Sequence, residues 1–270
     1  MMIAILRGLT LLGVLWASTA SNGAQVSEPT GEEIARRSLE AFYYAGNDMR
    51  ARIAMKLVNP EGNARNRELT MLRLNLGRAG GDQRYYIYFH APADVKGTTF
   101  MVWKYPAKED DRWIFIPAVK AVRRIAADDK RSSFVGSDFT YEDVSGRDLD
   151  EETHALLRKE DFEGRPAYVL ESRPKTPLDY VRRVSWIDRE RWVPLKEEYY
   201  NARNELIRVF TAGSVKQAGK HWTVTARTMK NLQTGHRTEV AFQEVEYGVG
   251  LSQEVFTERY LRDPPRQWIK

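Results

Sequence analysis

The sequence predicts a mainly β (α+β) fold in which consecutive strands pair as an antiparallel meander. Apolar and polar side chains alternate with a period of two through most of the 270 residues, as they do from Ala51 to Leu57. Turns separate about ten such segments, and short turns between consecutive strands favour antiparallel pairing. A sheet of that many twisted strands curls toward a barrel. No linker or internal repeat is visible, so we expect one domain.

The N-terminus has the pattern of a secretory signal peptide. Arg7 precedes a short apolar run, and small residues follow it, so cleavage is expected after Ala20 or Ala24. The apolar run is too short to span a bilayer, and a buried N-terminal helix is the less favoured alternative. We therefore assign residues 1–24 to a signal peptide and residues 25–270 to a single domain of an exported, periplasmic protein.

The composition limits the partners and the chemistry of this chain. Basic and acidic residues number 42 and 37, which gives a net charge of +5 that is spread along the chain. Nucleic-acid binding needs a clustered basic stripe, so no nucleic-acid partner is expected. Because the sequence has no cysteine, a disulfide, a thiol nucleophile, a cysteine metal site and a lipid-modified cysteine anchor are all excluded.

One amphipathic helix should begin the exported domain. Thr30 followed by Glu33 is a capping-box pattern, and Gly46 is a suitable stop for the helix. Between these positions the apolar residues recur on one helical face, at Ile34, Ala35, Leu39 and Phe42. This face must be buried against another part of the fold.

Strand patterns fill most of the remaining chain. A phase slip near Met71 in the segment 69–76 indicates a bulge, and residues 148–160 have a weak helical pattern. Two apolar runs that flank a charged turn, Thr98–Trp103 and Trp113–Ile116, predict a hairpin. The other predicted strands are residues 51–57, 84–92, 167–172, 181–187, 193–200, 206–212, 222–229 and 238–247.

The segment GSDFTYED is the best candidate for an active site. Asp138 and Asp143 lie five residues apart, and paired carboxylates can serve acid–base or metal chemistry. A structural role is favoured over this one: Gly136 suits a tight turn, and Asp138 is a good cap for main-chain N–H groups. In the structural reading Phe139 and Tyr141 alternate on a short strand, and a buried aspartate of this segment pairs with a nearby arginine such as Arg123 or Arg124.

Other catalytic motifs are missing from the sequence. The four histidines, His90, His154, His221 and His236, have no metal-site spacing. There is no G-x-S-x-G elbow for a serine hydrolase and no Walker A motif for a nucleotide. We therefore expect no catalysis, no cofactor and no metal.

Five segments together resemble a known family. They read VKGTTFMVW, WIFIPAVKAVRRI, SFVGSDFTYEDV, WIDRERWVPLKEEYY and MKNLQTGHRTEVAFQEVEY, in this order along the chain. These motifs resemble the LolA-like group of periplasmic outer-membrane lipoprotein-sorting proteins. The resemblance implies an incomplete antiparallel β-barrel, with an N-terminal helix and short lid helices over a hydrophobic cavity. Pattern alone favours a core filled with side chains, and the resemblance replaces that expectation.

The resemblance also implies a function. It predicts a periplasmic carrier that binds the acyl chains of lipids or lipoproteins and moves them between the inner and outer membrane. A periplasmic sensor of lipid or lipoprotein on the same fold is the alternative, and a hydrolase using Asp138 and Asp143 is less favoured. The implied partners are a lipid, lipoprotein or other amphiphile, an inner-membrane exporter of the RND type and an outer-membrane acceptor.

Two groups of residues carry the expectations about the site. The founding carrier holds its lid closed with an arginine near its second strand; Arg78 and Arg84 lie in that neighbourhood, but neither can be matched to it. Which strand face lines the cavity depends on register, because a slip of one residue moves every side chain to the other face. The candidates for lipid contact are Ile53, Met55, Leu57, Met71, Leu74, Tyr86, Tyr88, Phe100, Val102, Trp113 and Phe115.

Overall fold

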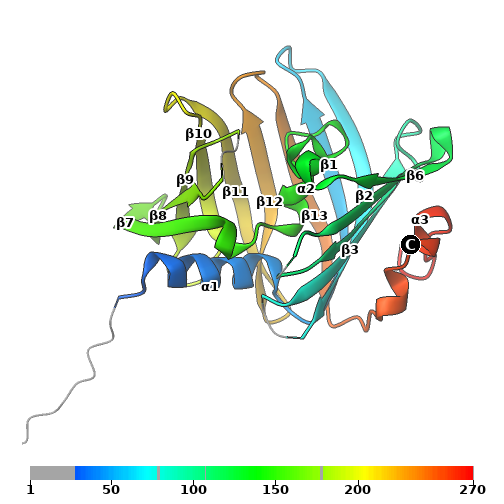
Figure 1. Ribbon diagram of the computed structural model, residues 1–270, viewed down its shortest axis with the longest axis horizontal. Helices are drawn as coiled ribbons and strands as arrows, with labels where there is room; N and C mark the ends of the chain where they lie inside the picture. Colours follow the sequence, from blue (N-terminus) through cyan, green and yellow to red (C-terminus); the bar gives the residue numbers. More distant parts are fainter. Residues whose placement is uncertain (1–27, 78–79, 107, 177–178, 270) are drawn as a thin grey trace, which may run out of the picture.

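The computed structural model describes residues 28–77, 80–106, 108–176 and 179–269. The expected signal peptide lies outside these residues. In the described part, a single antiparallel sheet curves around a concave face, and the helix α1 lies across that face (Figure 1). No helix in these four ranges is both long enough and apolar enough to cross a membrane.

The secondary structure is dominated by strands. The strands are β1 (Asp48–Val58), β2 (Ala64–Leu76), β3 (Asp82–Ala91), β4 (Thr99–Lys104), β5 (Asp111–Ile116), β6 (Ala121–Ile125), β7 (Glu152–Phe162), β8 (Arg165–Pro174), β9 (Arg182–Asp188), β10 (Pro194–Tyr200), β11 (Leu206–Ala218), β12 (His221–Asn231) and β13 (Arg237–Tyr247). The helices are α1 (Gly31–Tyr43), α2 (Tyr141–Ser145) and α3 (Arg259–Arg262), with the short 3₁₀ helices η1 (Pro117–Val119), η2 (Ala127–Arg131), η3 (Phe134–Gly136), η4 (Leu149–Glu151) and η5 (Gln253–Val255).

The strand order explains why the sheet is open. It runs β6-β5-β4-β3-β2-β1-β13-β12-β11-β10-β9-β8-β7, so consecutive strands pair with each other except β6 and β7, and β1 pairs with β13. The strands β6 and β7, which are consecutive in the chain, form the two opposite edges. The fold is therefore a mainly β, incomplete antiparallel barrel, as expected, and the segment between β6 and β7 must cross the opening.

The structure contains two strands, β6 and β7, that the sequence pattern did not predict. Residues 148–160, expected as a short helix, form η4 and most of β7. The register of β7 on β8 shifts between Leu156 and Arg158, and this irregularity interrupts the alternation that would have revealed a strand. The chain therefore has strands at β6 and β7 in addition to those that the pattern predicted.

The phase slip near Met71 has a different cause from the predicted bulge. The pairing of β2 with β1 is continuous through Met71, and the register shift on the β3 side lies between Glu68 and Leu69. Met71 packs in the concave core and its neighbour Leu72 in a second core on the convex face. Apolar residues follow each other here because both faces of the sheet are covered.

The C-terminal segment covers the convex face. Three side chains of the sheet donate hydrogen bonds to its main-chain oxygens: the Tyr86 hydroxyl to Tyr260 (2.7 Å), Thr99 Oγ1 to Leu261 (2.8 Å) and Trp103 Nε1 to Phe256 (2.8 Å). Figure 1 shows α3 on this outer side of the sheet. The segment buries its apolar residues Leu251, Val255, Phe256, Leu261 and Ile269 there.

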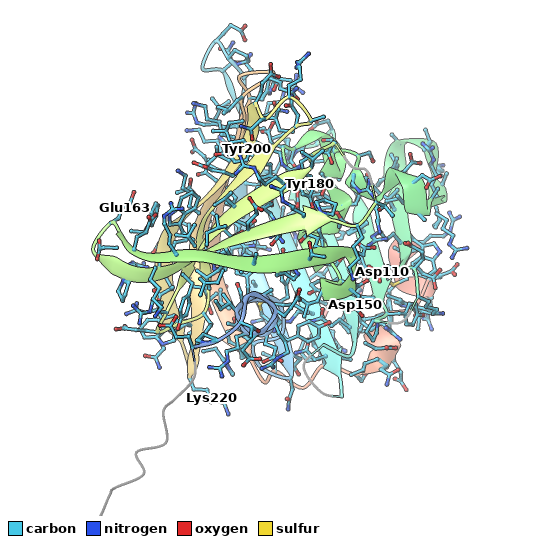
Figure 2. The ribbon with its side chains drawn as sticks, turned by 60° about the vertical axis from the view of Figure 1, so that its left-hand side comes forward. Asp110, Asp150, Glu163, Tyr180, Tyr200 and Lys220 are labelled. Carbon is cyan, nitrogen blue, oxygen red and sulfur yellow. The ribbon has the colours of Figure 1, made fainter. Side chains whose placement is uncertain are left out.

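The connection from β6 to β7, residues 126–151, crosses the concave face; we call it the lid segment. It contains η2, η3, α2 and η4. At its end, Asp148 accepts a hydrogen bond of 2.8 Å from Lys104 Nζ on β4. Figure 2 shows this region, with Asp110 before β5 and Asp150 before β7. The lid segment thus joins the two edges of the open sheet.

The helix α1 closes the other side of the concave face. Its N-cap is Thr30, whose Oγ1 accepts a hydrogen bond of 3.2 Å from the Glu33 amide, and it ends before Gly46, which has a φ of 70°. The buried side chains Ile34 and Ala35 pack against apolar residues of β8 and β9. The predicted N-cap at Thr30 is therefore confirmed, whereas the helix ends at Tyr43 with Tyr44 as its C-cap, before the predicted stop at Gly46.

Candidate ligand-binding hollow

An apolar hollow lies between the sheet, α1 and the lid segment. Its volume is about 850 Å³, including space open to solvent. Its walls come from β1, β2, β3, β12 and β13, and the lid segment contributes Phe134, Phe139 and Val144. The remaining apolar lining consists of Ala41, Phe42, Met49, Ile53, Met55, Leu69, Met71, Tyr85, Ile87, Trp222, Val224, Val240 and Phe242.

The structure divides the eleven predicted lipid-contact residues among three places. Ile53, Met55 and Met71 line the apolar hollow. Leu57, Phe100 and Val102 pack in the same concave core but lie outside the lining of the hollow. The other five belong to the convex core under the C-terminal segment: Leu74, Tyr86, Tyr88, Trp113 and Phe115.

The displaced candidates lie on strands that are apolar on both faces. On β3, Tyr85 and Ile87 face the hollow, while Tyr86 and Tyr88 face the C-terminal segment. Side chains alternate strictly along a strand, so choosing the wrong face moves the whole set. The C-terminal segment, which is far away in the sequence, covers the apolar side chains of the convex face. No local pattern on β3 therefore distinguishes the two faces.

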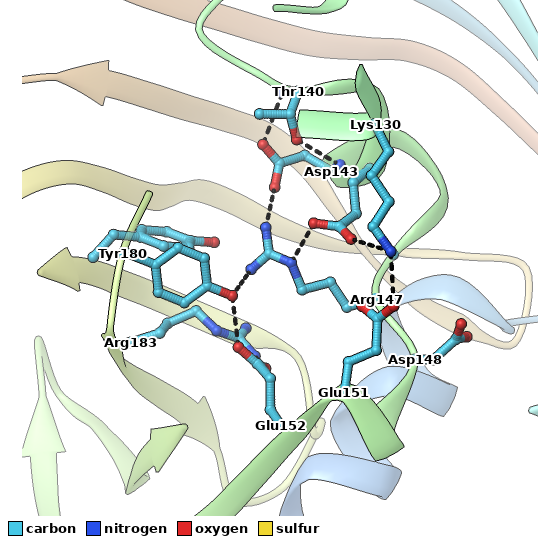
Figure 3. A network of polar contacts seen from close by, with 12 residues as sticks. Lys130, Thr140, Asp143, Arg147, Asp148, Glu151, Glu152, Tyr180 and Arg183 are labelled. Carbon is cyan, nitrogen blue, oxygen red and sulfur yellow. Dashed lines mark hydrogen bonds and ion pairs between the residues drawn. The ribbon is translucent and has the colours of Figure 1, made fainter. Parts of the chain in front are cut away.

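A second hollow, of about 840 Å³ including space open to solvent, adjoins the first and is lined by α1, the lid segment and strands β7 to β12, with charged residues from the lid segment, β7, β9, β10 and β12. We call it the polar hollow. Figure 3 shows the network around it, in which the Tyr180 hydroxyl donates a hydrogen bond of 2.6 Å to Glu152. Five residues line both hollows: Phe42, Tyr43, Phe139, Asp143 and Arg227.

Carboxylates neutralise the arginines of this network. Arg147 contacts Glu142 at 2.6 Å, and Arg183 contacts Glu152 at 2.5 Å and Glu197 at 2.6 Å. Burial alone would raise the pKa of Glu152, but the charges of Arg183 and Arg147 outweigh burial and lower the pKa to about 2. A hydrogen bond from Arg147 Nη1 to the hydroxyl of Tyr180, just before β9, joins the lid segment to the sheet (Figure 3).

The segment GSDFTYED forms the turn and helix of the lid. Thr140 Oγ1 accepts a hydrogen bond from the Asp143 amide (3.1 Å), and Asp143 Oδ2 accepts one from the Thr140 amide (2.8 Å). This reciprocal capping box begins α2 at Tyr141, so the predicted short strand is wrong. Gly136 has a φ of 74°, as a tight turn requires.

The two aspartates of this segment are both engaged. Asp138 Oδ2 accepts a hydrogen bond of 2.7 Å from Thr238 on β13. An aspartate of this segment does pair with arginines, but it is Asp143, and its partners are Arg208 and Arg147 instead of Arg123 or Arg124. Asp143 Oδ2 lies 3.2 Å from Arg208. Burial would raise the pKa of Asp143, but Arg208 and Arg147 outweigh it, and the pKa lies below its usual range.

An arginine that the sequence did not single out contacts the lid. Arg67 on β2 donates a hydrogen bond of 2.5 Å to the main-chain oxygen of Val135. Arg84, which was one of the two candidates, instead donates to the main-chain oxygens of Gln83 and Lys104, and Arg78 lies outside the described residues. The sequence could not single out Arg67, because β2 carries several basic residues and no pattern distinguishes one from another.

The described residues contain no cluster of His, Cys, Asp or Glu that could hold a metal ion. An open half-barrel that surrounds an apolar hollow under a lid is the architecture of a LolA-like fold. The comparisons with solved structures agree with this class. At 17% identity, a LolA superfamily protein from Nitrosomonas europaea shares the fold with a TM-score of 0.66, over 86% of this chain and 100% of that chain.

Two more similar structures establish the family. A domain from Vibrio parahaemolyticus described as an outer membrane lipoprotein-sorting protein is 31% identical, with a TM-score of 0.79, over 86% of this chain and 98% of that one. A DUF1329 family protein from Desulfovibrio piger is 29% identical, with a TM-score of 0.79, over 86% and 97% of the two chains. The chain belongs to the LolA-like family of outer-membrane lipoprotein-sorting proteins.

Two further comparisons add little about function. A family model with the description "Uncharacterized protein" matches residues 81–263. No curated protein matches the chain.

Proposed function

We propose that this protein is a periplasmic carrier, which binds the acyl chains of lipids or lipoproteins in the apolar hollow and moves them between the inner and outer membrane. The observation that supports this proposal is the hollow itself, which is apolar, is covered by α1 and the lid segment, and is partly open to solvent. An acyl chain gains about 0.8 kcal/mol for each CH₂ group that it buries. Such a chain therefore needs a protein pocket to cross an aqueous compartment.

Binding followed by release requires no covalent chemistry. Asp138 and Asp143, the candidates for a hydrolase, take part in the hydrogen bonds and ion pairs of the lid segment. This engagement favours a structural role for the two carboxylates over hydrolase chemistry. The partners that we propose are a lipid, lipoprotein or other amphiphile as cargo, an inner-membrane exporter of the RND type as donor and an outer-membrane acceptor.

A pair of variants tests whether the cargo occupies the apolar hollow. Met71 is partly buried and lines the hollow, and Tyr88 is partly buried on the opposite face of the sheet. Met71→Trp should fill the hollow and weaken the uptake of a fluorescent fatty acid at least tenfold, whereas Tyr88→Trp should leave uptake unchanged. Equal uptake by Met71→Trp and wild type would contradict the assignment of the site.

Two measurements on the wild-type protein test the carrier role. Lipid extraction and mass spectrometry of protein purified from its native periplasm should detect bound lipid. Protein loaded with the fluorescent fatty acid should then pass it to acceptor vesicles within minutes. Retention of the ligand in the presence of vesicles, together with binding to a membrane protein, would support a sensor, and protein without lipid that takes up no fatty acid would exclude both roles.

A further inference from the structure

Arg227 on β12 lies at the border of the two hollows and lines both of them. Within the described part of the chain, no carboxylate lies within 4.0 Å of its guanidinium group, and its buried Nε has no hydrogen-bond partner. Its one hydrogen bond in this part of the chain is long, 3.4 Å from Nη2 to the main-chain oxygen of Val224. Burial lowers its pKa to about 10, so the guanidinium remains charged at neutral pH.

Aromatic rings hold the Arg227 side chain in place. Its guanidinium carbon lies 4.3 Å from the ring centre of Phe242 on β13 and 4.8 Å from that of Phe42 on α1. Cation–π contacts of this kind position a guanidinium but satisfy none of its N–H donors. The group is therefore oriented without being neutralised.

A second arginine of the apolar hollow is in a similar situation. Arg73 on β2 is buried, donates to the main-chain oxygen of Ala45 and has a buried Nε without a hydrogen-bond partner among the described residues. Among the described residues, no carboxylate lies within 4.0 Å of the Arg73 guanidinium group. By contrast, Arg147 and Arg183, which line the polar hollow, each contact at least one carboxylate, and so does Arg208 on β11. The apolar hollow thus has uncompensated positive charge.

An uncompensated cation beside an apolar surface is costly unless an anion binds there. Removing a charged group from water without a partner is unfavourable by several kcal/mol. The guanidinium has five donors in a planar arrangement that matches the oxygens of a carboxylate or a phosphate. Asp143, which also lines the apolar hollow, is already paired with Arg208 and Arg147 and does not fill this role.

We propose that Arg227, assisted by Arg73, binds the anionic group of an amphiphile whose acyl chain lies in the apolar hollow. The preferred ligand is an acyl chain that carries a carboxylate or a phosphate, rather than a neutral lipid. This inference rests on the proposed function and specifies its substrate class. Arg227 Nε and Nη atoms are the donors to the anion, and the lining of β1, β2, β3 and β13 contacts the chain.

Two probes with the same chain and different head groups test the proposal: oleate and oleyl alcohol, measured at pH 8. Wild type should bind oleate at least roughly tenfold more tightly than oleyl alcohol, because a hydrogen bond between charged groups is much stronger than one between neutral groups. Arg227→Gln should reduce this ratio to near one without weakening oleyl alcohol, and Arg227→Lys should retain part of it. Arg203→Gln, in the exposed turn between β10 and β11, is the control and should keep the full ratio.

The outcomes separate this inference from the carrier role. Equal binding of oleate and oleyl alcohol by wild type overturns the inference and leaves the carrier proposal intact, and this comparison needs no variant. An unchanged ratio in folded Arg227→Gln, verified by its thermal unfolding midpoint, also overturns it. If the wild type binds neither probe, the carrier proposal itself is contradicted. Inorganic phosphate should not displace oleate at millimolar concentration; displacement that requires Arg227 would indicate a site for a free anion instead.

Discussion

Arg67 on β2 and Val135 in the lid segment are joined by a hydrogen bond of 2.5 Å from the guanidinium to the main-chain oxygen. Val135 has a φ of 50° and a ψ of 40°, in the left-handed region, which is unfavourable for a β-branched residue by about 1–2 kcal/mol. The contact with Arg67 therefore stabilises a lid conformation that is locally strained. A contact that offsets strain in this way can be released when the lid opens.

The first prediction concerns opening of the lid. Arg67→Gln should lose a hydrogen bond to a charged donor, with a cost of about 1.5–3 kcal/mol that falls mainly on the closed lid. Hydrogen–deuterium exchange of residues 134–140 should become at least tenfold faster, and a bound fluorescent fatty acid should leave sooner. Arg65→Gln, at an exposed position of the same strand, should change neither rate. Equal exchange in Arg67→Gln and wild type would show that this bond does not control the lid.

The second prediction concerns Glu152, which connects β7 to Arg183 and Tyr180. Removal of one partner from a buried ion pair typically costs about 3–5 kcal/mol, because the other charge stays buried. Glu152→Gln should therefore lower the free energy of unfolding at pH 7 by about 3 kcal/mol in chemical denaturation. Glu205→Gln, which removes an exposed pair with Arg203, should leave the denaturation midpoint unchanged.

The pH dependence of stability provides a second test of Glu152. The unfolded pKa is near 4.5 and the folded pKa is about 2, so the unfolded state binds the proton first as the pH falls. The stabilisation is present above pH 4.5 and is lost between pH 4.5 and 2. Glu152→Gln should show a shallower loss of stability across this window. A wild-type slope in the variant would mean that other carboxylates dominate acid unfolding.

The sequence predicted the strands better than it predicted which way their side chains face. Residues 98–103 and 113–116 form the expected hairpin of β4 and β5. On β4, Phe100 and Val102 point into the concave core, but on β5 Trp113 and Phe115 point to the convex core. The C-terminal segment covers that face from 150 residues away, so the deciding contact is not encoded in the local pattern.

For the candidate site too, features set by neighbouring residues in the sequence were open to prediction, and features set by distant parts of the chain were not. The pattern Thr140-x-x-Asp143 is a local capping signal, and it could have predicted α2, but the alternation of Phe139 and Tyr141 favoured a strand. The position of Arg227 could not be found in this way. That no carboxylate of the described residues pairs with it depends on which elements surround it, and these include α1 and β13.

The third prediction concerns His90 on β3. Burial lowers its pKa to about 4, and the positive charge of Arg52, whose Nη1 lies 2.8 Å from His90 Nε2, acts in the same direction. The unfolded histidine, with a pKa near 6.5, binds a proton before the folded one does, so stability falls as the pH drops from 6.5 to 4. His90→Gln should reduce this slope in thermal unfolding measured between pH 7 and pH 4.

The effect of His90→Gln should be partial. Burial also lowers the pKa of His154 and of His221, so both contribute to the same slope. His236, exposed in the turn between β12 and β13, provides a control, and His236→Gln should leave the curve unchanged. If His90→Gln and His236→Gln gave the same curve as wild type, His90 would not be held neutral in the folded protein.

The last prediction concerns Gly31, where α1 approaches the edge strand β7. A Cβ at this position would contact the main-chain oxygen of His154 and lie 2.8 Å from the Cα of Ala155, closer than real Cβ contacts allow. Alanine normally stabilises a helix relative to glycine, so the sign of the effect distinguishes packing from helix propensity. Gly31→Ala should displace α1 from β7 and lower the free energy of unfolding by about 2 kcal/mol.

Gly213→Ala on β11 is the matched control, because its Cβ would lie 3.6 Å from Ala226 Cβ, an ordinary contact. Chemical denaturation should show a loss of stability for Gly31→Ala that is clearly larger than the loss for Gly213→Ala. Since α1 also contributes Ala41, Phe42 and Tyr43 to the apolar hollow, Gly31→Ala should weaken fatty-acid uptake as well. A more stable Gly31→Ala protein with unchanged uptake would mean that α1 can move away from β7 without altering the site.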